Sequence, residues 1–198
     1  MIGADVTPAW LDQVAPGGTI LVNVAGGTGC AVLRLRVGNG IAQGRFLPQG
    51  AGFMPARTHR PVERASVDDD GEAGWTDLDP KVLTAQPEAS FVAQLATVDA
   101  RTVVSQADDG TELLFLEGAD GAWAEVETRP VVGRHRVVQG GPRRLWDLAE
   151  RTHRWWEGEG RPSWSAFGAT VTAADQWVWF GSPDSAHRWP VPVPERRA

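Results

Sequence analysis

The sequence predicts an α+β protein that is rich in strands and carries one amphipathic helix. Residues 19–25 form a near-continuous apolar run, which is typical of a strand buried on both faces of a parallel sheet. Asn39-Gly40, Asp109-Gly110 and Asp120-Gly121 are turn signals between alternating segments. Residues 142–157 repeat apolar side chains at helical spacing. The 198 residues are 42% hydrophobic and 22% charged, which is ordinary for a soluble globular chain.

The N-terminal fifty residues predict a helix, a strand and a hairpin. Thr7 is a suitable N-cap and Pro8 suits the first helical position, where its missing N–H costs nothing. Pro16-Gly17-Gly18 ends this helix. The apolar strand follows, and two further strands over 31–37 and 41–47 form the hairpin.

The rest of the chain predicts a separate β-rich unit. Residues 66–77 are an acidic loop that we take as the linker between a first domain at 1–65 and a second at 78–198. In the second domain, 182–194 read as an irregular proline-rich tail. The remaining expected elements are a helix over 88–97, meander strands over 101–106, 111–117, 122–127 and 134–139, the helix over 142–157, and a hairpin over 167–172 and 176–180.

The net charge of -6 is distributed unevenly. Residues 66–127 hold fifteen acidic residues against Lys81 and Arg101, whereas both flanking segments are basic. We interpret the acidic run as a solvated surface. The alternatives are that it faces the basic flanking segments within the fold or that it receives a basic partner. No segment is basic enough to indicate nucleic-acid binding. A single cysteine and the absence of a long apolar run predict a cytoplasmic protein with no membrane span.

The glycine loop at 26–29 follows an apolar strand, as a nucleotide-binding loop would. That chemistry requires a helix next and an acidic residue roughly 20 positions later. Here Leu and Arg alternate through 31–37, and the next acidic residue after Asp12 is Glu63. A turn between two strands is therefore the better interpretation.

Other polar groups give no metal or catalytic site. Asp68, Asp69, Asp70 and Glu72 lack the alternating spacing of a calcium loop, and the four histidines are scattered. Ser182, Asp184, Ser185 and His187 carry the atoms of a hydrolytic triad, but local turn bonds explain such neighbours better. The tryptophans at 155, 156, 177 and 179 either pack against each other or form a binding surface.

The first sixty residues resemble the C-terminal half of the protein-L-isoaspartate O-methyltransferase family. The resemblance depends on 7–14, on 16–22 with the glycines after that strand, and on Phe53-Met54-Pro55. The remainder resembles the long tail of actinobacterial members that are associated with ATP-grasp ligases and peptide maturation. The segments that carry this second resemblance are 140–146, 161–162, 167–172, 176–179 and 182–185.

This resemblance implies the C-terminal part of a Rossmann-like methyltransferase sheet followed by a β-rich accessory domain. The implied activity is transfer of a methyl group from S-adenosylmethionine to an aspartate or isoaspartate carboxylate of a protein or peptide. The family's cofactor-binding and catalytic residues precede the point at which this chain begins, so none is assigned here. We expect the chain alone to bind no S-adenosylmethionine. Candidate substrate-binding residues are Phe53, Met54, Pro55, Trp177 and Trp179.

Two alternatives to an enzyme stay open. The chain is either a non-catalytic peptide-binding accessory module of a peptide-maturation system or a gene-model fragment. Expected partners are a protein or peptide substrate, the missing N-terminal half, or a second copy. The last two follow from the strand at 20–24, which would lack its neighbour and expose an open edge. By the same reasoning, residues 78–198 should stay soluble alone.

Overall fold

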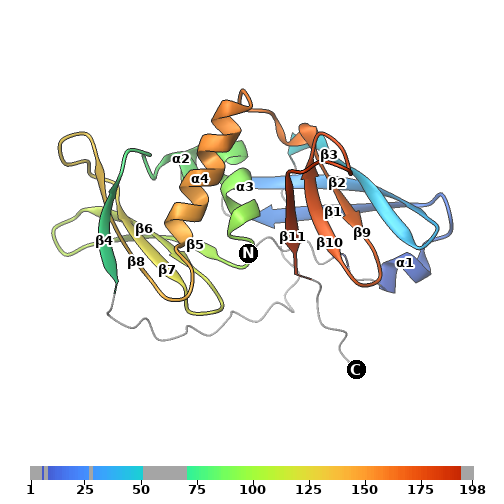
Figure 1. Ribbon diagram of the computed structural model, residues 1–198, viewed down its shortest axis with the longest axis horizontal. Coiled ribbons are helices and arrows are strands. Elements are labelled where there is room, and N and C mark those ends of the chain that lie inside the picture. The colour runs from blue at the N-terminus through green and yellow to red at the C-terminus, as the bar shows by residue number, and fades with distance from the viewer. Residues whose placement is uncertain (1–5, 7–8, 27–28, 51–70, 193–198) are drawn as a thin grey trace.

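The computed structural model describes residue 6 and residues 9–26, 29–50 and 71–192. Two antiparallel sheets lie on either side of a layer of helices (Figure 1). Sheet A has six strands in the order β1-β2-β3-β9-β10-β11, and sheet B has five in the order β4-β8-β7-β6-β5. Every described pairing is antiparallel, so the structure shows none of the parallel pairs of a Rossmann-like sheet.

Sheet A begins with two consecutive hairpins. Its first three strands are β1 (Thr19–Gly26), β2 (Gly29–Gly38) and β3 (Ile41–Gly50). Gly26 pairs with Gly29, so the glycine loop joins two strands, as predicted. Asn39 and Gly40 both have positive φ, at 52° and 73°, which is the conformation of a type I′ hairpin turn.

The expectation that residues 20–24 are buried on both faces is wrong. Ile20 and Val24 are 6% and 3% exposed, but Leu21 is 62% exposed. Successive side chains of a strand point to opposite faces, and only one face of β1 is covered. Within the described residues, β1 pairs only with β2 and forms an edge of sheet A.

The second half of sheet A comes from the C-terminal end of the chain. It consists of β9 (Phe167–Val171), β10 (Gln176–Phe180) and β11 (Arg188–Val191). β3 pairs with β9, for example Ala42 with Val171, so N- and C-terminal segments share one sheet and one core. The division into domains at 1–65 and 78–198 stays a prediction, although β3 of the first and β9 of the second lie in the same sheet. The structure thus gives a reason to expect that residues 78–198 alone would lose solubility, because β9 would lack its partner.

Two elements appear where the sequence predicted irregular chain. β11 lies in the expected proline-rich tail, and β4 (Glu72–Thr76) overlaps the expected linker. β4 pairs with β8 (His135–Gly140) at one edge of sheet B. The predicted meander is confirmed, with β5 (Arg101–Gln106), β6 (Glu112–Glu117) and β7 (Trp123–Glu127) completing the sheet.

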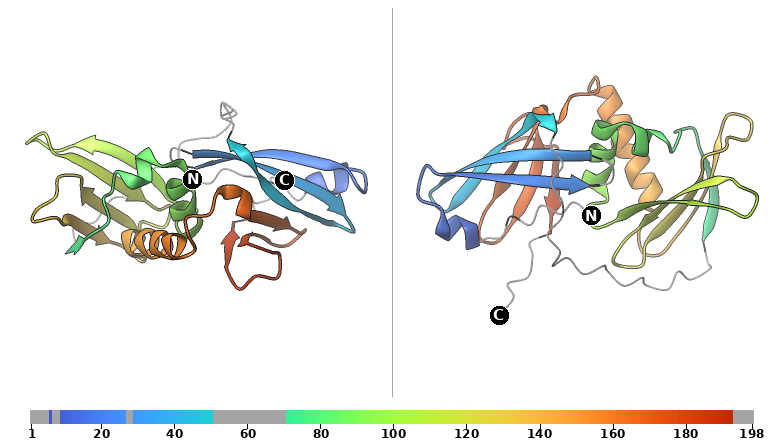
Figure 2. Two further views of the ribbon diagram at one scale, coloured as in Figure 1. Left: turned by 90° about the horizontal axis from the view of Figure 1, so that it is seen from above. Right: turned by 180° about the vertical axis from the view of Figure 1, so that it is seen from behind.

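The helices between the sheets bury side chains in both cores. They are α2 (Val82–Ala85), α3 (Pro87–Ala96) and α4 (Leu145–Gly158), and α1 (Ala9–Gln13) lies at the far end of sheet A (Figure 2). Phe91 of α3 and Trp156 of α4 belong to the core of sheet A, whereas Ala93 and Trp146 belong to the core of sheet B. The helices at 88–97 and 142–157 are therefore confirmed. The cap proposed at Thr7 and Pro8 lies outside the described residues.

Candidate functional site

The outward side of strands β2 and β3 carries the strongest local concentration of positive charge in sheet A. Arg34, Arg36 and Arg45 are exposed, while their neighbours Leu33 and Leu35 are 2% and 0% exposed. This follows from the two-residue period of a strand, which places apolar side chains toward the helices and arginines toward solvent. We call these three arginines, together with Gln43, the basic face.

The strand register brings two of these arginines directly opposite each other. Arg34 pairs with Arg45, and Arg36 pairs with Gln43. Like charges at directly opposite positions destabilise an antiparallel pair. Among the described residues, neither Arg34 nor Arg36 forms an ion pair or a side-chain hydrogen bond. The part of the chain that the structure describes therefore leaves positive charge on the basic face uncompensated, and an anionic ligand would neutralise it.

Arg45, in contrast, is held in place by the C-terminal strands. Its Nη1 and Nη2 atoms donate to the carbonyl oxygens of Ala166 and Gly181 at 3.3 and 2.5 Å. Its guanidinium lies 4.9 Å from the ring centroid of Trp179, which is a cation–π contact. The Arg45 guanidinium is thus a fixed positive group, whereas the side chains of Arg34 and Arg36 are available to a ligand.

The predicted binding residue Trp179 lies beneath Arg45 and is 2% exposed. Its indole N–H donates to Thr170 Oγ1 at 3.1 Å, and Gln43 Nε2 donates to the same oxygen at 3.0 Å. The ring also fills the space above Gly168, where an added Cβ would come within 2.2 Å of it. Trp179 therefore supports the basic face from below.

Of the other predicted binding residues, Trp177 lies two positions before Trp179 on β10, so both side chains point to the same side of sheet A. Trp177 is partly exposed, and its buried Nε1 has no hydrogen-bond partner in the described structure. Phe53, Met54 and Pro55 lie outside the described residues. A substrate-binding role for these five residues stays a prediction. Arg34, Arg36 and Arg45 were not among the predicted residues, although the Leu–Arg alternation through 31–37 was a signal for the first two.

Trp155 and Trp156 pack inside the protein. The Trp155 ring centroid lies 5.3 Å from that of Phe180 and 5.1 Å from that of Trp189, between α4 and the C-terminal strands. Trp156 is 4% exposed and donates its indole N–H to Pro162 O at 2.8 Å. For these two tryptophans, the prediction that they pack against other side chains is confirmed, and they do not form an exposed binding surface.

A small apolar pocket lies within the curve of sheet A. Its lining includes Val24, Leu33, Phe46, Val171 and Val178, and its free volume is about 20 Å³. That volume holds about one water molecule, and the lining offers few polar groups to bind one. The pocket is far too small for a nucleotide or a peptide.

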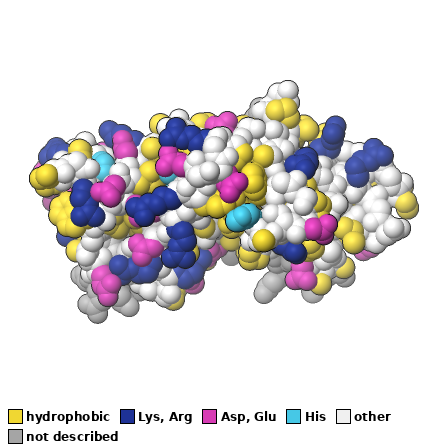
Figure 3. All heavy atoms as spheres, turned by 45° about the horizontal axis from the view of Figure 1, so that its top comes forward, with side chains coloured by type: hydrophobic (Ala, Val, Ile, Leu, Met, Phe, Trp, Pro, Cys, Tyr) yellow, Lys and Arg dark blue, Asp and Glu magenta, His cyan; other side chains and the backbone are white. Residues whose placement is uncertain are grey.

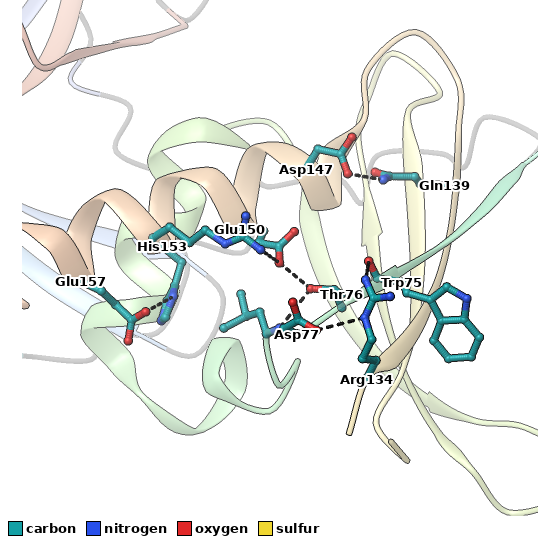
Figure 4. Close-up of polar contacts among 11 residues, drawn as sticks. Trp75, Thr76, Asp77, Arg134, Gln139, Asp147, Glu150, His153 and Glu157 are labelled. Carbon is teal, nitrogen blue, oxygen red and sulfur yellow. Dashed lines mark hydrogen bonds and ion pairs between the residues drawn. The ribbon is translucent and has the colours of Figure 1, made fainter. Parts of the chain in front are cut away.

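A second cluster of polar side chains joins α4 to sheet B (Figure 4). Thr76 Oγ1 donates to Glu150 Oε1 at 2.7 Å, and Arg154 Nη2 donates to the same carboxylate at 2.8 Å. Gln139 uses both ends of its amide. Nε2 donates to Asp147 at 2.6 Å, and Oε1 accepts from the backbone N–H of Trp146 at 3.0 Å.

The Gln139 contact has a clear structural role. The first N–H groups of a helix lack partners within the helix, and Arg144 at the N-cap provides no side-chain bond. Gln139 of β8 supplies the missing acceptor and thereby fixes the start of α4 on sheet B. The polar cluster is therefore a docking joint between helix and sheet.

His153 is the buried titratable group of this region. It is 3% exposed, and its Nδ1 lies 3.8 Å from Glu157 Oε2 without a hydrogen bond. Burial lowers the pKa of His153, against the opposing influence of the Glu157 carboxylate. The neutral imidazole therefore prevails at neutral pH.

The remaining polar residues that the sequence singled out are the Ser182–His187 segment and the candidate metal ligands. His187 N–H donates to Ser185 Oγ at 3.1 Å and Ser185 N–H to Ser182 O at 3.0 Å, so local turn bonds are confirmed for that segment. Within the described residues, no group of three or more His, Cys, Asp or Glu side chains is placed to hold a metal ion. Of Asp68, Asp69, Asp70 and Glu72, only Glu72 lies in the described residues, and it accepts a hydrogen bond from Arg144 at 2.7 Å.

No helix in the described ranges is long and apolar enough to cross a lipid bilayer.

Comparison with known proteins gives little to assign a family. No protein-family model matches the chain, and no curated protein matches it. A solved structure entitled protein-L-isoaspartate O-methyltransferase is similar with a TM-score of 0.41 and 16% sequence identity. The match covers 91% of this chain and 52% of that one, so the chain spans about half the length of that protein. A similarity of this degree establishes neither a common fold nor a common activity.

Proposed function

We propose that the chain is a peptide-binding module whose ligand is an extended, acidic segment of a partner protein. The observation that carries the proposal is the juxtaposition of Arg34 and Arg45 on the exposed side of sheet A, on the two strands next to its β1 edge. Positive charge that the described fold leaves uncompensated supports binding of a carboxylate-bearing ligand.

The edge at β1 supports an extended conformation of the ligand. A strand added beside β1 would lie about 4.8 Å from it and pair with its outward N–H and C=O groups. Leu21 is exposed on the same side as Arg34, with which it pairs directly. An apolar side chain of the added strand would cover Leu21. Acidic side chains two positions away would meet the long side chains of Arg34 and Arg36.

A peptide-binding module is one of the two alternatives to an enzyme that the sequence leaves open. Candidates for the acidic segment are a peptide substrate or the cofactor-binding half of a methyltransferase. β1 of a second copy carries no acidic residue and does not fit this ligand. Methyl transfer stays an inference from family resemblance, and we propose that this chain alone does not bind S-adenosylmethionine. Titration calorimetry checks that point, and a one-to-one micromolar complex would contradict it.

The proposed binding is tested with two eight-residue peptides in fluorescence anisotropy titrations. One has valine at position 4, glutamate at positions 2 and 6 and threonine elsewhere, so that the valine and both glutamates lie on the same face of an extended strand. The other has lysine in place of both glutamates. We expect the intact chain to bind the acidic peptide, more weakly as salt increases, and to discriminate against the basic one. The double variant Arg34→Gln, Arg36→Gln should lose at least about tenfold in affinity, which corresponds to about 1.4 kcal/mol.

Arg151→Gln is the matched control, since Arg151 is exposed on α4 and makes no ion pair with a described residue. It should bind as the unchanged chain does. Hydrogen exchange then distinguishes edge pairing from binding on the face alone, because edge pairing protects the amides of β1. Equal affinity for both peptides would refute the role of the basic face.

A further inference from the structure

The outer side of sheet B, which faces away from the helices, carries an unusual mixture of apolar and charged side chains. Its inward residues, such as Leu114, Ala124 and Val126, form the core against α4. The alternate residues point outward and are only partly covered. They are Leu113 and Phe115 of β6, Trp123 and Glu125 of β7, Val138 of β8, and Val103 of β5. We call these six residues the outer face of sheet B.

The strand register places Glu125 at the centre of this face. On one side Glu125 pairs with Val138, which in turn pairs with Ala73 of β4. On the other side Glu125 pairs with Phe115, which in turn pairs with Val103 of β5. Glu125 is therefore the one charged residue in a row of apolar residues that crosses all five strands.

The other charged residues around this row neutralise each other. Arg101 Nη2 lies 2.5 Å from Glu117 Oε2 across β5 and β6. Arg136 Nη1 lies 3.3 Å from Glu127 Oε1 across β7 and β8. Glu125 forms neither an ion pair nor a side-chain hydrogen bond with any described residue. Within the ranges that the structure describes, no basic side chain compensates its carboxylate.

The apolar surface continues to the tip of the β7–β8 hairpin. Val131 is 49% exposed and Val132 is 99% exposed. Val132 also has a φ of 51°, a left-handed conformation that is strained for a β-branched residue. Beside the tip stands Trp75 of β4, 49% exposed, whose carbonyl oxygen accepts a hydrogen bond from Arg134 at 3.3 Å.

Figure 3 shows hydrophobic side chains at the end of the molecule that is formed by sheet B. A tight turn with Gly133 needs no exposed valine at this position, and asparagine would fit it with less strain. Exposed apolar side chains grouped at such a tip are typical of a docking element.

We propose that the outer face of sheet B, with its hairpin tip, docks a second kind of partner segment, one in which an arginine or lysine is flanked by apolar side chains. A purely apolar partner would bury the Glu125 carboxylate without a counter-charge, which is strongly unfavourable. A basic side chain at the centre neutralises Glu125 and lies against the rings of Phe115 and Trp123. The flanking apolar side chains cover Val103, Val138 and Val132.

The charge distribution of the chain agrees with this partner. Arginines after β7 pair with several carboxylates of the acidic part of the sequence. Residues 71–140 still hold twelve acidic residues against five basic ones, so this part of the chain attracts a basic segment over several ångströms. The basic face of sheet A belongs to the other end of the molecule (Figure 1). The two faces therefore select ligands of opposite charge. Binding at one face does not require binding at the other.

The test uses the full chain and two five-residue peptides, leucine-valine-X-valine-leucine, in which X is arginine or glutamine. Affinity is measured by fluorescence anisotropy of the labelled peptides. We expect the arginine peptide to bind at least about tenfold more tightly than the glutamine peptide. Glu125→Gln should abolish this difference, and Glu125→Arg should favour a glutamate-containing peptide instead. Glu159→Gln, at an exposed position after α4, should change nothing.

A second variant separates binding from folding. Val132→Asn should weaken binding of the arginine peptide several-fold while leaving the protein at least as stable, because it removes only the apolar tip. Thermal unfolding of Glu125→Gln and Val132→Asn, followed by circular dichroism, confirms that both are folded. Retention of the arginine preference in Glu125→Gln would overturn the proposal.

The occupant is tested separately by light scattering without peptide. Dimerisation that Glu125→Gln abolishes would identify a second copy of the chain as the occupant and would overturn the assignment to a partner segment. Failure of this proposal leaves the Arg34 and Arg36 experiment untouched, since the two faces lie on different sheets.

Discussion

Exchanging Arg34 for glutamate should stabilise the fold and abolish binding of the acidic peptide. In the unchanged protein Arg34 lies directly opposite Arg45, and Arg36 extends from the same strand on the same side. Arg34→Glu converts a like-charge pair into an opposite-charge pair across two strands. A residue that weakens the fold and is needed for binding is the expected signature of a functional site.

The size of the effect follows from the cross-strand geometry. Opposite-charge pairs at directly facing positions contribute about 0.2–1 kcal/mol, and like-charge pairs cost a similar amount. Two unit charges about 4 Å apart in water interact by about 1 kcal/mol, which gives the same scale. Reversing the sign therefore adds about 1 kcal/mol to the free energy of unfolding. For a chain of this length, that is a Tm rise of about 2–4 °C.

Thermal unfolding at two ionic strengths checks this reasoning. The Debye length is about 10 Å at 0.1 M salt and about 3 Å at 1 M, so high salt should remove most of the difference between Arg34→Glu and the unchanged chain. Arg34→Gln should give about half the gain, and Arg151→Gln none. A loss of stability in Arg34→Glu at low salt would refute the argument that Arg34 and Arg45 repel each other.

Three further predictions concern the fold. Gly44→Ala should destabilise the protein by more than about 2 kcal/mol in urea unfolding, because the new Cβ would lie 1.8 Å from the backbone oxygen of Arg34, which cannot move aside; wild-type stability would contradict the packing of β2 on β3. His153→Gln should flatten the pH dependence of the free energy of unfolding. The pKa of His153 is lowered in the folded state, so the unfolded chain binds the proton more readily. The contribution of neutral His153 to stability is therefore fully present above the unfolded-state pKa near 6.5 and is lost as the pH falls below it. A variant that still loses as much stability as the unchanged chain between pH 7.5 and 5.5 would exclude His153 as the cause. Val132→Asn should raise the Tm by about 2–4 °C, since asparagine tolerates the positive φ of 51°; an unchanged or lower Tm would show that this turn is not strained.

Local sequence signals determined most of the strands and turns. Asn39-Gly40 and Asp120-Gly121 mark hairpins because few other residues accept positive φ at low cost. The alternation of leucine and arginine in β2 already indicated one buried and one exposed face. Strands in the expected tail and linker were missed because Pro190 in β11 and the glycines around β4 are local signs of irregular chain.

The spacing of apolar residues in α4 also could not show which elements the helix packs against. Both sides of this helix are covered, because a sheet lies on either side of the helix layer, so Trp146 and His153 are buried together with the predicted apolar stripe. A single amphipathic stripe describes a helix on one surface, and α4 packs on two.

The sequence by itself determined which residues alternate and where the chain turns, since these depend on neighbours a few positions apart. Only the tertiary structure decided which side chains meet. The pairing of β3 with β9 joins residues more than a hundred positions apart and closes one sheet from both ends of the chain. Register places Arg34 opposite Arg45 and sets Glu125 between Val138 and Phe115. A shift of one residue in either pairing would move these charges to the other face, so the candidate sites depend on long-range pairing that no local pattern specifies.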